Sequence, residues 1–222
     1  MIIIPLSFPA CDKEEAPPEG QLPVFQVGDQ WVWSYVYVMD GKTYTLTEEV
    51  IREETVDGRD CYVLDMSFDP VMSSTHDDVV YTTTSMKYWM DKATCLYGVK
   101  HEYTTSANGQ VFTSSIIYSY STWASLFPLE ISKVVEAEKT ATSYFNGEQY
   151  GDIVTGTETY TVESKEDITV AAGTFSCWKI TYFDSASGTT QTMWWSDEAK
   201  TMVKSINEGG VTLMELQSYS VN

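Results

Sequence analysis

The chain has 222 residues and a formal net charge of −19, with 43% hydrophobic and 14% aromatic residues. Such an acidic surface repels phosphate backbones and anionic lipid, which argues against nucleic-acid binding. No apolar run approaches the roughly 20 residues that a membrane-spanning helix needs. The apolar content is that of a globular chain, and the abundant Tyr, Trp, Thr and Val favour strands. The composition therefore predicts an all-β protein with few or no helices.

The N-terminal segment is typical of an export signal. Residues 1–10 are MIIIPLSFPA and lead directly into Cys11. This series resembles the end of a bacterial lipoprotein signal, and the resemblance implies that Cys11 carries the lipid. Residues 11–23 are charged and Pro-rich, so we expect a disordered acidic tether. We therefore expect an exported protein, lipid-anchored at the cell surface or in the periplasm, with membrane contact only through Cys11. The alternative is an ordinary N-terminus with an incidental Cys.

From residue 24 onward, strand-like segments alternate with turn signals. Residues 31–38 place aromatic side chains on one face and mostly Val on the other. Further strand-like segments are 61–68, 79–90, 111–121, 175–183 and 211–219. Two-residue turn signals occur at Asp40-Gly41, Asp57-Gly58, Asn108-Gly109, Asn146-Gly147, Ser187-Gly188 and Gly209-Gly210. This pattern predicts an antiparallel meander of about 11–12 strands.

The body also repeats itself. Residues 45–66 and 159–182 are each an acidic, Thr-rich strand, a turn with Gly, and a strand with a Cys-aromatic pair, Cys61-Tyr62 or Cys177-Trp178. Downstream, YWMDKA at 88–93 resembles WWSDEA at 194–199. We predict a single duplicated β domain over 24–222, with copy one at about 24–121, copy two at about 133–222 and an extra loop at 69–78. A strongly curved sheet or a barrel-like sandwich suits such a duplication.

The second copy resembles a family of secreted and lipid-anchored β proteins of unknown function. The resemblance covers about residues 125–220 and rests on Phe127-Pro128-Leu129, on VAAGTF at 170–175 and on WWSDE at 194–198. The first copy is similar to a diverged version of the same pattern. In architecture, such proteins are similar to the LolA/LppX-type curved sheets that carry lipids on a concave face. The resemblance thus implies hydrophobic-ligand binding as an expectation at the level of the fold.

The sequence offers little catalytic chemistry. His76 and His101 are its two histidines, and it has no nucleophile elbow, phosphate-binding loop, dinucleotide fingerprint or metalloprotease motif. We therefore predict no catalytic residues, no cofactor and no enzyme; a hydrolase using His101 beside Glu102 is the weakest hypothesis. An acidic loop could hold a metal but matches no known calcium loop, so we predict a solvated loop and no metal site. Its residues are Asp69, His76, Asp77 and Asp78.

Apart from Cys11, the cysteines are Cys61, Cys95 and Cys177, and this odd number allows one disulfide at most. Cys61 and Cys177 lie at matching positions of the two copies, inside apolar strands. We therefore expect two buried core thiols rather than a redox pair.

Aromatic residues give the functional prediction. Adjacent Trp194 and Trp195 must point to opposite faces of a strand, so one of them meets solvent, a second layer, a ligand or a partner. A double-layered core is the alternative to an aromatic-lined concavity for a lipid, glycan or peptide. The predicted ligand-binding residues are Trp33, Tyr35, Trp89, Trp194 and Trp195.

Together these patterns predict a non-catalytic cell-envelope lipoprotein whose β domain binds a lipid or other hydrophobic ligand, or another envelope protein. The competing hypothesis is a structural or assembly component that pairs through exposed strand edges.

Overall fold

The computed structural model describes residues 19–38, 41–76 and 78–222. The signal-like segment, Cys11 and most of the predicted tether lie outside these ranges. No helix of the described residues is long and apolar enough to cross a membrane.

The described residues form strands joined by turns and loops. The strands are β1 (Gln30–Tyr37), β2 (Lys42–Val56), β3 (Arg59–Asp69), β4 (Ser73–His76), β5 (Val79–Asp91), β6 (Gly98–Ala107), β7 (Gln110–Tyr120), β8 (Val134–Phe145), β9 (Glu148–Gln149), β10 (Val154–Val170), β11 (Gly173–Asp184), β12 (Thr189–Ser196), β13 (Thr201–Asn207) and β14 (Thr212–Ser220).

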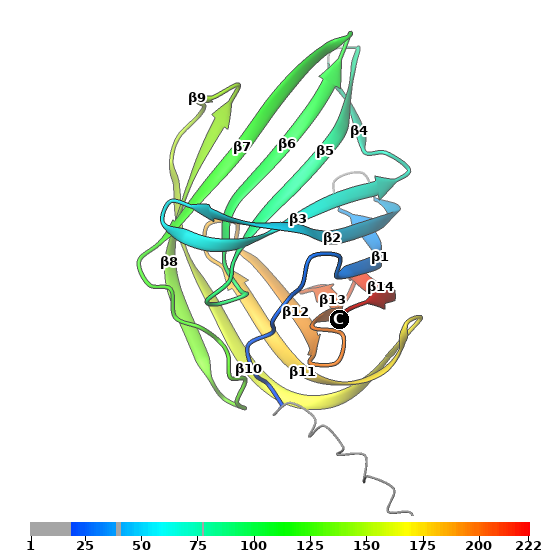
Figure 1. Cartoon of the computed structure of the whole chain (residues 1–222), viewed down its shortest axis with the longest axis vertical. Coiled ribbons are helices and arrows are strands. Elements are labelled where there is room, and N and C mark those ends of the chain that lie inside the picture. Colours follow the sequence, from blue (N-terminus) through cyan, green and yellow to red (C-terminus); the bar gives the residue numbers. More distant parts are fainter. Residues whose placement is uncertain (1–18, 39–40, 77) are drawn as a thin grey trace, which may run out of the picture.

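All pairings are antiparallel, and the sheet closes on itself. Its order runs β10-β11-β12-β13-β14-β1-β2-β3-β5-β6-β7-β8, and β8 then pairs with β10. Figure 1 shows these strands wrapped around a common interior. The result is a closed 12-strand barrel, which confirms the predicted all-β, strongly curved antiparallel meander. Two short strands lie outside the closed path: β4 on β5, within the segment expected to be a loop, and β9 on β8.

Tight hairpin turns set the register, as the turn signals predicted. Asn108 and Gly109 have φ of 51° and 77°, and Asn146 and Gly147 have φ of 49° and 86°. Two successive positive φ values match the right-handed twist of the flanking strands, and Asn and Gly tolerate them best. The Asn146 side-chain oxygen also accepts a hydrogen bond from the Thr113 backbone N–H at 3.0 Å.

Because every strand pairing is antiparallel, successive connections alternate between the two ends of the barrel. These two ends differ in structure. One end, which we call the packed end, carries residues 19–29 and the connections 92–97, 121–133 and 197–200. These segments fold inward and supply core side chains, namely Phe25, Cys95, Tyr97, Leu126, Phe127, Leu129 and Ala199. The connections at the opposite end, which we call the turn end, add no described residue to that core cluster. The core therefore fills the barrel mainly from the packed end.

The two predicted copies occupy equivalent places in the barrel. The last strand of each pairs with the first strand of the other: β14 with β1, and β7 with β8. The Val50 N–H donates to the Asp29 carbonyl at 2.9 Å, and the Val162 N–H donates to the Lys133 carbonyl at 2.9 Å. A register shift follows Val50 on β2 and Val162 on β10. These matched features support the proposal that the domain is internally duplicated, with the join at 121–133.

The three described cysteines are free and buried. Burial raises the pKa of the Cys61 thiol to about 11 and those of Cys95 and Cys177 to about 12. Protonated, enclosed thiols are poor nucleophiles. The prediction that Cys61 and Cys177 are buried core thiols is confirmed.

Candidate ligand-binding lumen

Trp33 and Tyr35 on β1 face the barrel interior. Each pairs with a residue of β2 on the same face: Trp33 with Leu46 and Tyr35 with Tyr44. Trp33 is only 1% exposed and belongs to the core cluster, while Tyr35 is partly buried at its margin. Trp33 is therefore a wall residue of the interior rather than an open contact surface.

Trp89 and Trp194 lie on the other face of the wall. Trp89 on β5 donates its indole N–H to Glu54 at 3.2 Å, and Trp194 on β12 donates to Glu166 at 2.6 Å. The Lys100 ammonium lies 4.6 Å from the ring centroid of Trp89. Both indoles thus donate to a glutamate at matching positions in the two halves of the barrel. The five residues predicted to bind a ligand therefore do not gather in one place, and their binding role stays a prediction.

Trp195 faces inward and lines an apolar cavity of about 210 Å³ near the packed end. Phe127 packs edge-on against its ring, with centroids 5.3 Å apart. The Trp195 indole N–H is buried and has no hydrogen-bond partner among the described residues. The other walls of this cavity are mainly apolar, including Leu126, Ile180 and Met193. Of the five predicted residues, Trp195 therefore has the position that best suits a binding role.

A second cavity, of about 260 Å³, lies next to the first and is lined chiefly by tyrosines. Cross-strand pairs place its side chains on one face: Tyr88 with His101, Tyr120 with Lys139, and Tyr160 with Tyr182. These residues come from neighbouring strands, β5 to β8, β10 and β11. We call this space the tyrosine cavity; its lining includes Tyr88, His101, Tyr118, Tyr120, Lys139, Glu158, Tyr160 and Tyr182.

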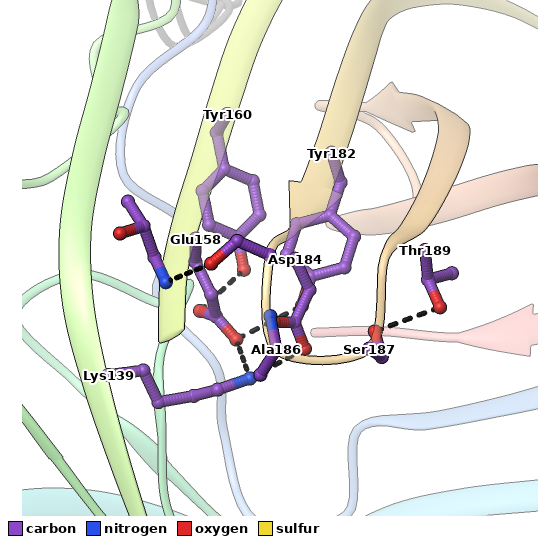
Figure 2. Close-up of polar contacts among 10 residues, drawn as sticks. Lys139, Glu158, Tyr160, Tyr182, Asp184, Ala186, Ser187 and Thr189 are labelled. Atoms are coloured by element: carbon purple, nitrogen blue, oxygen red, sulfur yellow. Dashed lines mark hydrogen bonds and ion pairs between the residues drawn. The ribbon is translucent and has the colours of Figure 1, made fainter. Parts of the chain in front are cut away.

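A buried ion cluster forms one wall of the tyrosine cavity (Figure 2). The Lys139 Nζ lies 2.6 Å from Oε1 of Glu158 and 2.9 Å from Oδ2 of Asp184. Tyr182 donates its hydroxyl to Oε1 of Glu158 at 3.0 Å, and Tyr160 donates to Oε2 at 3.4 Å. All three charged side chains are at least 88% buried. Ion pairs and hydrogen bonds from neighbouring side chains thus replace water around each charge.

The protonation states of the ion cluster follow from these contacts. Burial alone would lower the pKa of Lys139, but the hydrogen bonds and charges of Glu158 and Asp184 outweigh it and raise that pKa above its usual value. Burial alone would raise the pKa of Asp184, but Lys139 and the Ala186 N–H hold it below its usual value. Lys139 is therefore a charged ammonium at neutral pH, unsuited to act as a nucleophile.

The remaining lining groups are neutral. Burial lowers the pKa of His101 to about 4, so its imidazole is uncharged at neutral pH. Its Nδ1 lies 3.2 Å from the Tyr103 hydroxyl. Burial also raises the pKa values of Tyr88, Tyr118 and Tyr120, so these phenols stay protonated. The cavity thus presents phenol hydroxyls and an imidazole around a satisfied ion cluster.

Backbone spacing holds one of these phenols in place. Gly98 on β6 lies against the Tyr88 ring, and a Cβ at position 98 would stand 2.5 Å from Cε2 of Tyr88. Only a residue without a side chain allows this approach. Gly98 therefore sets the position of Tyr88 in the cavity wall.

The arrangement of the described residues does not support the hypotheses of catalysis and metal binding. His101 faces the lumen, whereas Glu102 on the opposite face binds Lys100 at 2.6 Å, so the adjacent pair that suggested a hydrolase is separated. No group of three or more His, Cys, Asp or Glu residues that could hold a metal occurs within residues 19–38, 41–76 and 78–222. Asp77 and the side chain of His76, which belong to the acidic-loop hypothesis, lie outside the described part of the chain.

Sequence reasoning missed the tyrosine cavity, although a signal for it exists. Alternate positions on several strands carry its groups, as in Tyr118-x-Tyr120, Glu158-x-Tyr160 and Tyr182-x-Asp184. A spacing of two places both members on one face. The register that brings these three segments and Lys139 together depends on the closure of β8 onto β10.

Comparisons with known proteins give distant likenesses. No protein-family model matches the chain, and no curated protein matches it significantly. A Bacteroides fragilis NCTC 9343 structure, described as an exported protein with a YmcC-like fold, has a TM-score of 0.45 and 14% identity over 88% of this chain and 97% of that one. A structure described as a lipoprotein of Parabacteroides distasonis ATCC 8503 has a TM-score of 0.41 and 13% identity, over 91% and 100% of the chains. Likenesses this low assign no function to the present chain.

Proposed function

We propose that the protein is a non-catalytic cell-envelope lipoprotein whose barrel lumen holds a small amphipathic molecule. The observation that carries the proposal is the contact between the two cavities, because Leu96 and Tyr160 line both of them. One cavity is walled by hydroxyls and an ion cluster, and the other by aliphatic, methionine and aromatic side chains. A ligand with a hydrogen-bonding part and an apolar part matches this division.

The methionines of the interior suit an adaptable apolar site. Met193 and Met202 line the apolar cavity, and Met90 and Met214 pack against the core cluster. Methionine is unbranched and polarizable, so it adapts to ligands of irregular shape. We expect the apolar part of the ligand to lie against Met193 and Trp195.

The proposed anchoring fits the position of the N-terminal segment. Residues 19–29 lie at the packed end, where the Gly20 N–H donates to Asp197 at 2.8 Å and Lys165 pairs with Glu19. A lipid on Cys11 would therefore hold the packed end toward the membrane and leave the turn end facing away. Incorporation of a radiolabelled fatty acid tests this step, and Cys11→Ser should abolish the labelling.

Native mass spectrometry and a neutral apolar probe test the binding proposal. Protein purified without detergent should carry a lipid-sized mass that is lost on denaturation, or should bind N-phenyl-1-naphthylamine saturably. Leu96→Trp places extra volume between the two cavities and should abolish probe binding. Val111→Trp, at an exposed position of β7, is the matched control and should bind normally. A clean unliganded mass together with no saturable probe binding would refute the proposal.

Assembly through strand edges has less support than ligand binding. Each of the twelve barrel strands is paired on both sides along part of its length. Among the described strands, edges paired on one side include β4, β9, residues 50–56 of β2 and residues 162–170 of β10. These stretches are short, so they give few backbone groups for pairing. Size-exclusion chromatography tests this alternative, which requires an oligomer in place of a monomer.

A further inference from the structure

We propose that the tyrosine cavity takes a neutral saccharide unit. This inference rests on the proposed function, because it names the polar part of the molecule held in the lumen. Three properties of the cavity carry it: its charge balance, its unpartnered hydroxyls and its aromatic walls.

Charge balance argues for a neutral group. The cavity wall holds one ammonium, Lys139, between two carboxylates, Glu158 and Asp184. An anion would have to displace a carboxylate from Lys139 inside a molecule with a net charge of −19. A cation would meet the Lys139 ammonium and find Glu158 already accepting from Lys139, Tyr160 and Tyr182. Breaking buried ion pairs is costly, so a neutral ligand is favoured.

Unpartnered hydroxyls argue for a ligand rich in hydroxyl groups. No hydrogen bond joins the hydroxyls of Tyr88, Tyr118 and Tyr120 to another described residue, although each hydroxyl can donate and accept. The Tyr97 hydroxyl also lacks a partner among these residues, but it does not line the cavity. A ligand with several hydroxyls would give the three cavity phenols hydrogen-bond partners in place of water.

The aromatic walls suit the apolar face of a sugar ring. Tyr160 and Tyr182 lie side by side with ring centroids 4.9 Å apart, and Tyr97 and Tyr120 with centroids 4.4 Å apart. Tyrosine offers a rigid apolar face with a polar tip, which matches the C–H face and hydroxyl rim of a pyranose. The volume of about 260 Å³ lies below the range of drug-sized sites, so one small unit fits better than an oligosaccharide.

Two sources could supply such a group, a free saccharide or the headgroup of a glycolipid, and paired glycosides distinguish them. Methyl and octyl glycosides of glucose, galactose, mannose and N-acetylglucosamine are titrated by isothermal calorimetry, the octyl forms below their critical micelle concentration. We expect saturable binding of at least one neutral sugar and weaker binding of methyl glucuronide and glucosamine. Much tighter binding of the octyl form assigns the group to an amphiphile, whereas equal affinities assign it to a free saccharide.

A hydroxyl-deleting variant locates the binding. The double variant Tyr118→Phe/Tyr120→Phe keeps both rings and should weaken glycoside binding by about tenfold or more. Tyr150→Phe, at an exposed tyrosine, is the control and should leave the affinity unchanged. If N-phenyl-1-naphthylamine binds but every glycoside fails, or if the double variant binds normally, this inference is overturned while the proposed function stands. If neither the probe nor any glycoside binds and the native mass is that of the unliganded chain, both proposals are refuted.

Discussion

At the scale of single residues, Lys139 supplies the counter-charge for two buried carboxylates, those of Glu158 and Asp184. Its side chain is 10% exposed, and those of Glu158 and Asp184 are 7% and 12% exposed. Lys139→Met removes the cation and leaves two buried carboxylates without a counter-charge, which should cost about 3–5 kcal/mol of unfolding free energy at pH 7. Urea denaturation measures this loss.

The pH dependence of the same variant has a definite sign. Because pairing holds the pKa of Asp184 below its usual value, this stabilisation is present above the unfolded-state pKa of Asp and is lost as pH falls through the folded-state pKa. The deficit of Lys139→Met should therefore shrink in acid. The triple variant Lys139→Met/Glu158→Gln/Asp184→Asn should recover much of the loss at pH 7. A triple variant as unstable as the single one would contradict this account.

Glu48 on β2 is a lumen-facing carboxyl without an ion partner among the described residues. It pairs across the sheet with Trp31 on β1 and Met66 on β3. Burial raises its pKa to about 7, and the nearby Trp33 indole, which makes no well-aligned hydrogen bond, offsets this only in part. Ionisation of Glu48 therefore costs folding stability near neutral pH.

Glu48→Gln should remove that cost. Since the folded-state pKa is raised, the wild-type protein keeps full stability below the ordinary pKa of Glu and loses it as pH rises through about 7. At pH 8 the variant should be more stable by about 1–3 kcal/mol, and at pH 4 it should show no gain. Glu49→Gln, on the opposite face of β2, is the control and should keep the wild-type pH profile. Equal profiles for wild type and Glu48→Gln would contradict the assignment.

At the scale of elements, the contact between β5 and β6 depends on Gly98. Gly98→Ala would place a Cβ 2.5 Å from the Tyr88 ring and should cost about 1–3 kcal/mol, because the buried ring must move. The same change should weaken glycoside binding. Gly209→Ala, in an exposed turn where the nearest atom to a Cβ lies at 3.4 Å, should change neither property. Denaturant unfolding measures the first effect and calorimetry the second.

The strands and turns were largely predictable from the sequence, because they depend on local chemistry. Asn108-Gly109 and Asn146-Gly147 mark hairpins by the backbone angles that these residues tolerate. The 11–12 strands expected correspond to the twelve of the barrel. The short strand β4 was missed because Ser73–His76 has no apolar alternation to mark it.

The candidate site was predictable only in kind. An aromatic-lined concavity was expected as the alternative to a double-layered core, and it was assigned to four tryptophans and Tyr35. Trp89 and Trp194 donate to carboxylates on the other face, and their binding role stays a prediction. The tyrosine cavity requires Lys139 on β8 to reach Asp184 on β11 across β10, a contact between residues 45 positions apart. Local patterns carry no information about such a register.

At the scale of the whole molecule, the barrel is closed by contacts between its two halves. Since β1 pairs with β14 and β7 with β8, each half depends on the other to cover both of its outer edges. We expect residues 19–121 and 122–222 to lack cooperative unfolding when produced separately, and a mixture of the two to regain it. Far-UV circular dichroism with urea denaturation checks both outcomes. Cooperative unfolding of either half as a monomer would refute this dependence.

Asn222 contacts residues near the start of β1, and this proximity would allow the chain to be circularly permuted. The Asn222 backbone N–H donates to Asp29 at 2.8 Å, and Lys200 donates both to the Asn222 carbonyl and to the Val24 carbonyl. A short peptide joining Asn222 to the segment before Asp29 would therefore make the path of the chain a ring. Reopening that ring within 121–133 would give a circular permutant in which the second copy precedes the first, with every strand pairing kept.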